Sequence, residues 1–110
     1  MKPIWYRVTD LDTARAFYTG KLGFTETGAD DDWAELEREG MKIALAEGEP
    51  FLDGLVASVD VADVMAEADH LRDDEVEIGT VLELHDEVRI VDVYDPDGNR
   101  LQLVQQLGDS

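Results

Sequence analysis

The side chains best suited to bind or transform a small molecule stand at alternate positions of short apolar segments. Trp5 and Arg7 alternate with three such residues near the start of the chain, Ile4, Tyr6 and Val8. Successive side chains of a strand point to opposite faces, so Trp5 and Arg7 share a face if the other three pack against a helix. The same alternation adds Trp33, Ser58, Asp60 and Gln102. Two indoles, a guanidinium, an amide and a hydroxyl suit a small aromatic or anionic ligand.

These residues also have structural explanations. Trp5 and Trp33 suit ordinary packing, in the core of a monomer or at a contact between two copies. Arg7 is one of few cations in an acidic chain, and it can equally form a salt bridge with a nearby acid such as Asp60. The sequence leaves both explanations open.

The sequence lacks the residues or spacings that several other kinds of catalytic site require. The chain has no cysteine, which excludes a disulfide, a thiol nucleophile and a cysteine-ligated zinc site. His70 is expected near the end of a helix and His85 in a turn beside two acids, so both are predicted to be surface or structural residues. The sequence shows neither a Ser-His-Asp spacing nor a glycine-rich phosphate loop. Catalytic residues therefore stay unassigned.

The net charge excludes whole classes of partner. Nine basic and 27 acidic residues give a formal net charge of −18 and an isoelectric point near 4.1. Such a charge argues against nucleic acid or an anionic membrane as a partner. The acids are spread through the chain, which is typical of a solvated surface and suggests a halophilic protein. No segment is apolar enough to span a bilayer and no signal-peptide pattern is present, so we expect a cytoplasmic location.

The length of 110 residues predicts one domain, and its pattern predicts two similar halves. Val-Thr-Asp-Leu at 8–11 matches Val-Ala-Asp-Val at 61–64, and each aspartate is placed to cap a helix. Helices are expected over 11–22 and from 64 to Asp73-Asp74. Strands are expected over 4–8, 24–27, 33–37, 41–46, 55–61, 76–84, 88–94 and 101–106. The halves are module one (1–47) and module two (55–107), joined by a linker (48–54).

A tight turn is predicted at 95–99, Asp-Pro-Asp-Gly-Asn, because proline presets φ and glycine accepts a positive φ. This turn, the Val-Thr-Asp-Leu segment, Phe17-Tyr18 and Leu22-Gly23-Phe24 together resemble the vicinal-oxygen-chelate superfamily. That superfamily includes glyoxalase I, bleomycin-resistance proteins and extradiol dioxygenases. The resemblance implies an α+β fold in which two βαβββ modules form a curved sheet around a cup. It also implies a homodimer with the cups at or near the subunit contact.

The resemblance further implies where a metal would be held. Metal-dependent members use His, Glu or Gln from four strands, and the matching positions here are Pro3, Ala44, Val56 and Gln102. Three of these side chains offer no donor atom, and a single amide oxygen does not make a catalytic divalent site. We therefore expect no metal and no cofactor. The metal-dependent activities of the superfamily, namely glyoxalase, dioxygenase and epimerase activity, are therefore not expected here.

Three functions remain open. The first is a small-molecule-binding protein of the glyoxalase or bleomycin-resistance type, without an intact metal site. The second is a metal-dependent lyase or dioxygenase of the same superfamily with displaced ligands. The third is a dimeric interaction module that binds no ligand.

Overall fold

The computed structural model describes residues 3–49 and 56–107. Module one consists of β1 (Ile4–Val8), α1 (Leu11–Gly20), β2 (Thr25–Ala29), β3 (Trp33–Arg38) and β4 (Met41–Glu47). Module two repeats this order with β5 (Ala57–Asp60), α2 (Val64–Asp73), β6 (Leu82–Leu84), β7 (Val88–Tyr94) and β8 (Arg100–Gln106). The predicted α+β fold of two βαβββ modules is confirmed. Most of the predicted linker lies outside the described residues.

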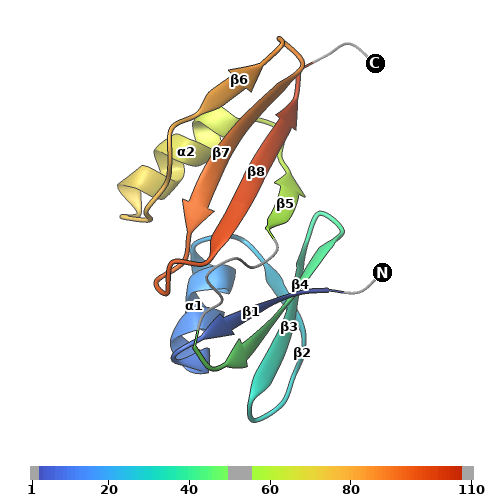
Figure 1. The fold of residues 1–110 in the computed structure, drawn as a ribbon, viewed down its shortest axis with the longest axis vertical. Helices are drawn as coiled ribbons and strands as arrows, with labels where there is room; N and C mark the ends of the chain where they lie inside the picture. The colour runs from blue at the N-terminus through green and yellow to red at the C-terminus, as the bar shows by residue number, and fades with distance from the viewer. Residues whose placement is uncertain (1–2, 50–55, 108–110) are drawn as a thin grey trace.

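Each module forms its own four-stranded sheet, in the order β1-β4-β3-β2 and β5-β8-β7-β6. The first strand of each module is parallel to the last, and the other pairings are antiparallel. Within the described ranges, no strand of one sheet pairs with a strand of the other. The expected curved surface is thus made of two separate sheets, set one beyond the other along the 44 Å axis of the molecule (Figure 1).

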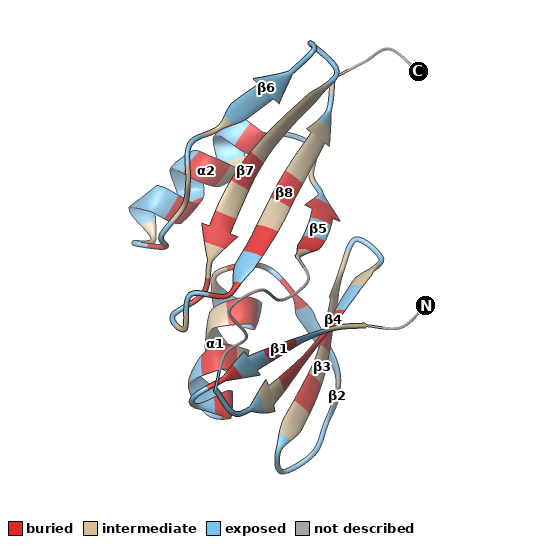
Figure 2. Ribbon diagram, viewed as in Figure 1, coloured by how far each residue is buried: buried red, intermediate tan, exposed pale blue. Residues whose placement is uncertain are grey.

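One helix packs on one face of each sheet. α1 contacts β3 and β4, and α2 contacts β7 and β8. Buried side chains of both modules, among them Tyr18, Leu45, Val59 and Val93, form one continuous core beneath the helices (Figure 2). The other face of each sheet is called its open face below. Each helix has ten residues, and no helix in the described part of the chain is long and apolar enough to cross a membrane.

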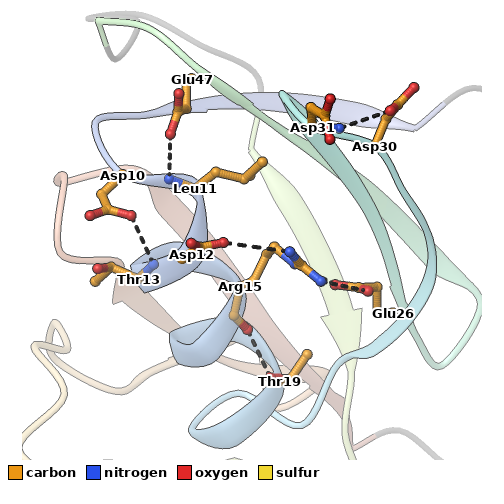
Figure 3. A network of polar contacts seen from close by, with 10 residues as sticks. All are labelled: Asp10, Leu11, Asp12, Thr13, Arg15, Thr19, Glu26, Asp30, Asp31 and Glu47. Carbon is orange, nitrogen blue, oxygen red and sulfur yellow. Dashed lines mark hydrogen bonds and ion pairs between the residues drawn. The ribbon is translucent and has the colours of Figure 1, made fainter.

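Both helices begin at the predicted aspartates. Asp10 Oδ1 accepts a hydrogen bond from the Thr13 amide at 3.2 Å, and Asp63 Oδ1 accepts one from the Ala66 amide at 3.0 Å. Figure 3 shows a second carboxylate at the start of α1: Glu47, at the end of β4, accepts from the Leu11 amide at 3.1 Å. Two of the free amides in the first turn of α1 therefore have acceptors from different elements.

The strand expected over 76–84 is interrupted, and this prediction was wrong in its extent. Ile78 bridges Val93, whereas Leu82 lies opposite Ile90. Between these two pairs, the stretch before β6 advances four residues, whereas β7 advances three. The stretch before β6 therefore holds one extra residue, as in a β-bulge. Regular pairing then continues only over Leu82–Leu84.

The turn between β7 and β8 reaches down to α1 and joins the two modules (Figure 1). Asp95 is buried there, and its carboxylate accepts from the amides of Asp97 and Asn99 at 2.9 and 2.8 Å. It also accepts from Asn99 Nδ2 at 2.9 Å and from the Tyr18 hydroxyl of α1 at 2.8 Å. Asn99 Nδ2 in turn donates to the Arg7 carbonyl at 2.8 Å. The predicted turn, with Gly98 at φ 85°, thus fixes one module against the other.

Candidate functional site

Three of the predicted site residues share the open face of module one. Arg7 lies opposite Ala46, and Ala46 lies opposite Trp33, so Arg7 and Trp33 flank an alanine in one row. Trp5 stands in the adjacent row, opposite Ala44. Small side chains between the large ones leave the Trp5 indole accessible, and this residue is 50% exposed. The face therefore presents an indole and a guanidinium on neighbouring rows of the same strand.

The other three predicted residues share the open face of module two. Ser58, Gln102 and Asp92 form one row across β5, β8 and β7. Gln102 Nε2 donates to Asp92 Oδ1 at 3.3 Å, and Arg100 forms an ion pair with Asp92 at 3.4 Å. Asp60 stands one row away, opposite Val104. The six predicted residues thus fall into two groups of three, on two different sheets.

The structure also contains a cleft of about 590 Å³ at the junction of the modules, which sequence reasoning missed. Its lining comes from the β3–β4 turn, the end of β5 and the first turn of α2: Arg38, Glu39, Asp60, Val61, Ala62, Asp63, Ala66 and Glu67. Arg38 forms an ion pair with Glu67 and donates to the Leu22 carbonyl at 2.9 Å. No local pattern signals this cleft, because residues 38–39 and 60–67 meet only in the folded chain.

The four positions that the resemblance assigns to metal ligands hold a single side chain with a donor atom. Pro3, Ala44 and Val56 have no donor atom in their side chains, and Gln102, whose Nε2 donates to Asp92, offers one neutral amide oxygen. Within residues 3–49 and 56–107, no three side chains of His, Cys, Asp or Glu lie close enough to hold a metal ion. The two histidines lie where they were expected: His70 is exposed on α2, and His85 is exposed in the turn after β6.

Two buried tyrosines at the junction are electrostatically unsuited to act as bases. Burial, then the nearby Asp95 charge, raises the pKa of Tyr6 to about 12, against an opposing hydrogen bond from the Ala57 amide. Burial raises the pKa of Tyr18 further, and its hydrogen bond to Asp95 acts in the same direction. Both side chains are therefore neutral donors at neutral pH, with roles in positioning the modules.

The folded chain is similar to known structures along nearly its whole length. An integron cassette protein from the Halifax Harbour sewage outfall metagenome matches with a TM-score of 0.82 at 19% identity, covering 96% of this chain and 97% of that one. A fosfomycin resistance protein, FosX, from Listeria monocytogenes has a TM-score of 0.78 at 18% identity, covering 96% and 91%. The antibiotic binding protein TnmS3 from Streptomyces sp. CB03234 has a TM-score of 0.74 at 20% identity, covering 96% of each chain.

A search among curated proteins finds no significant match. The family model for the glyoxalase, bleomycin resistance protein and dioxygenase superfamily, in contrast, matches residues 1–103. This match includes both helices, the turn at 95–99 and every strand except the last three residues of β8. The chain belongs to the glyoxalase/bleomycin resistance protein/dioxygenase superfamily.

Proposed function

We propose that this protein binds a small molecule and works without the metal centre of its superfamily. The observation that carries this proposal is the chemistry of the four family positions. Proline, alanine and valine side chains cannot ligate a metal, and the one neutral amide oxygen of Gln102 does not by itself make a catalytic divalent site. Because these four positions do not supply a metal site, the function that the indole and guanidinium of the open face support best is the binding of a small molecule.

The proposed ligand is aromatic or anionic and lies on the open face of module one. A half-exposed indole at Trp5 offers a flat apolar surface, and Arg7 offers a planar cation two residues away. TnmS3, which shares the fold, is described as an antibiotic binding protein. Binding without chemistry is therefore a role that this fold supports.

We further propose that the protein is a homodimer whose contact lies at or near the open faces. The argument is the exposure of large apolar side chains there, since open sheet faces of this kind are usually covered by a partner. Light scattering at micromolar concentration should give twice the chain mass. A monomer mass at that concentration would contradict this part of the proposal.

The test of binding uses a probe, 1-anilinonaphthalene-8-sulfonate, which is aromatic and anionic. We expect saturable binding by the parent protein and a loss of about tenfold in affinity for Trp5→Ala, because a stacking surface disappears. The loss of stability should stay below about 1 kcal/mol, as for most exposed sites. Met65→Ala on α2 is the matched control, since Met65 is 45% exposed and lies on neither open face. Equal affinities for the parent and Trp5→Ala would refute the assignment.

The alternative is a metal-dependent lyase or dioxygenase with displaced ligands. The observation in its favour is that a mutant of the Listeria FosX protein has been solved with Mn(II), on the same fold. Elemental analysis of the purified protein separates the two functions. About one zinc, iron, manganese or nickel per subunit would support the alternative, and a metal content near zero would support binding. A dimer that binds neither metal nor probe would instead fit an interaction module.

A further inference from the structure

The start of α2 corresponds to the start of α1, because the two modules repeat the same local contacts there. Each helix is capped by an aspartate. Glu47, at the end of β4, accepts a hydrogen bond from the Leu11 amide at 3.1 Å. Gln105, at the end of β8, accepts one from the Val64 amide at 2.9 Å. The surroundings of the two helix starts can therefore be compared position by position.

The start of α1 is covered by a turn of the other module. Five residues, 95–99, separate Tyr94 from Arg100, the pair nearest the turn between β7 and β8. This turn reaches α1 (Figure 1), and its Asp97 carboxylate accepts from the Thr9 hydroxyl at 2.8 Å and from the Thr9 amide at 3.3 Å. Polypeptide therefore fills the space in front of α1.

The start of α2 faces a shorter turn and is left open. Only Glu39 and Gly40 separate the paired ends of β3 and β4. Both residues have a positive φ, 52° and 78°, as in a two-residue hairpin turn. With three residues fewer than the turn at 95–99, this turn leaves a cleft of about 590 Å³ in front of α2. Ala62 lines the cleft at the position that Thr9 holds in module one.

Two of the four carboxylates that line the cleft lack a partner. Asp63 accepts from an amide in the first turn of α2, and Glu67 forms an ion pair with Arg38. The side chains of Glu39 and Asp60 form no hydrogen bond or ion pair with the described part of the chain. Glu39 belongs to module one and Asp60 to module two, so unpaired negative charge stands on both sides of the junction. This arrangement attracts cations and repels anions.

We infer that the junction cleft binds a small organic dication, a linear diamine or an aminoalkylguanidine. One charged group meets Glu39 and the other meets Asp60. The methylene chain between them lies against the apolar part of the lining, which is formed by Val61, Ala62 and Ala66. The cleft volume falls within the range of about 300–1,000 Å³ that small-molecule sites occupy. The ligand takes the place that the turn between β7 and β8 occupies in front of α1.

The cleft is distinct from the surfaces assigned above. Of the six residues predicted to face the cup, Asp60 alone lines the cleft. The large apolar side chains that are exposed in the described residues, Trp5, Met65, Leu82 and Leu84, all lie outside its lining. Neither the ligand proposed for the open face of module one nor the proposed dimer contact therefore accounts for the cleft.

Amide-resolved NMR titrations with two probes of similar length test this inference. Agmatine is cationic at both ends, whereas 4-guanidinobutanoate carries a carboxylate in place of the ammonium group. Agmatine should shift the amides of Glu39, Asp60 and Ala62 saturably, with a dissociation constant of about 1 mM. The second probe should bind about tenfold more weakly, because it places a negative charge beside a carboxylate. Glu39→Gln and Asp60→Asn should each weaken agmatine binding about threefold, as for an exposed ion pair.

Asp32→Asn is the matched control, since it removes one exposed charge outside the cleft lining and should leave agmatine binding unchanged. Equal binding of the two probes, or an unchanged agmatine affinity in Glu39→Gln or Asp60→Asn, would overturn the inference. A loss of equal size in Asp32→Asn would also overturn it, because agmatine would then respond to net charge and not to the cleft. The Trp5 indole resonance should stay fixed with agmatine and move with 1-anilinonaphthalene-8-sulfonate. Failure at the cleft is therefore distinguishable from failure of the proposed function.

Discussion

At the scale of single residues, Asp95 shows how one buried carboxylate organises two modules. It accepts four hydrogen bonds, two from its own turn, one from Asn99 Nδ2 and one from Tyr18. Asn99 continues the chain of contacts to the backbone of Arg7, a predicted site residue. The carboxylate thereby links the geometry of the turn to the position of β1.

We expect Asp95→Ala to lower the free energy of unfolding by about 2–4 kcal/mol, because the substitution leaves several buried donors without an acceptor. Urea denaturation followed by circular dichroism measures the change. Asp32→Ala is the control, because it removes the same charge from an exposed position. An equal loss in the two variants would show that charge, and not hydrogen bonding, accounts for the effect.

Tyr6 should make the stability of the protein depend on alkaline pH. Its hydroxyl donates to the Arg100 carbonyl at 2.6 Å and accepts from the Ala57 amide at 2.9 Å. Burial raises its pKa to about 12, whereas an unfolded tyrosine titrates near about 10. The unfolded state therefore loses its proton first, and the stabilisation, complete below about pH 10, is lost between about pH 10 and 12 at up to about 1.4 kcal/mol per pH unit.

Comparison with Tyr6→Phe isolates this contribution. The variant should be less stable at pH 7, and the difference from the parent should narrow above about pH 10, because only the parent loses the contribution of Tyr6. Urea denaturation at several pH values between 7 and 11 measures both curves. Curves that stay parallel would contradict the assignment of the pKa to this hydroxyl.

Residue-level features were predictable where they depend on local periodicity. Alternation placed Trp5 and Arg7 on one face, and the turn chemistry at 95–99 gave the positive φ of Gly98. The bond between Asp95 and Tyr18 joins residues 77 positions apart. No local pattern specifies such a contact, because it depends on how the two modules pack. The division of the six site residues between two sheets was unpredictable for the same reason.

At the scale of elements, α1 is anchored by two carboxylates. Asp10 binds the Thr13 amide, and Glu47 binds the Leu11 amide from the end of β4. Each of Asp10→Ala and Glu47→Ala should lower the free energy of unfolding by about 1 kcal/mol, as for other helix caps. Because the two carboxylates bind different amides, the double variant should lose the sum. Urea denaturation of the two single variants and the double variant gives the interaction energy between the two carboxylates. A double variant as stable as the less stable single variant would contradict the expected sum.

The extent of the strand predicted over residues 76–84 was wrong because its register could not be inferred from composition. The apolar content of residues 76–84 indicates one strand, and a one-residue insertion leaves that content unchanged. The shift is visible only in the pairing, where Ile78 meets Val93 and Leu82 meets Ile90. Element order was predictable from the repeat of the two capping aspartates, whereas strand register depends on partners distant in sequence.

At the scale of the whole molecule, the acidic surface is mostly uncompensated. Among the described residues, ion pairs join five arginines to six carboxylates: Arg15, Arg38, Arg72, Arg89 and Arg100 pair with Asp12, Glu26, Glu67, Asp69, Glu83 and Asp92. The chain carries 27 acidic residues and a formal net charge of −18. Folding brings many of these charges together, and the same repulsion opposes the association of two copies.

This repulsion should make the melting temperature depend strongly on salt. Each exposed pair of like charges contributes less than about 1 kcal/mol, but many pairs act against a net stability of only about 5–15 kcal/mol. The screening length falls from about 10 Å at 0.1 M salt to about 3 Å at 1 M. We therefore expect the melting temperature to rise steeply from low salt to about 1 M KCl, and more slowly beyond that concentration. Differential scanning calorimetry over this range measures the effect. A melting temperature that is flat or falls would show that the acidic groups are already compensated, and would remove the reason to regard the protein as halophilic.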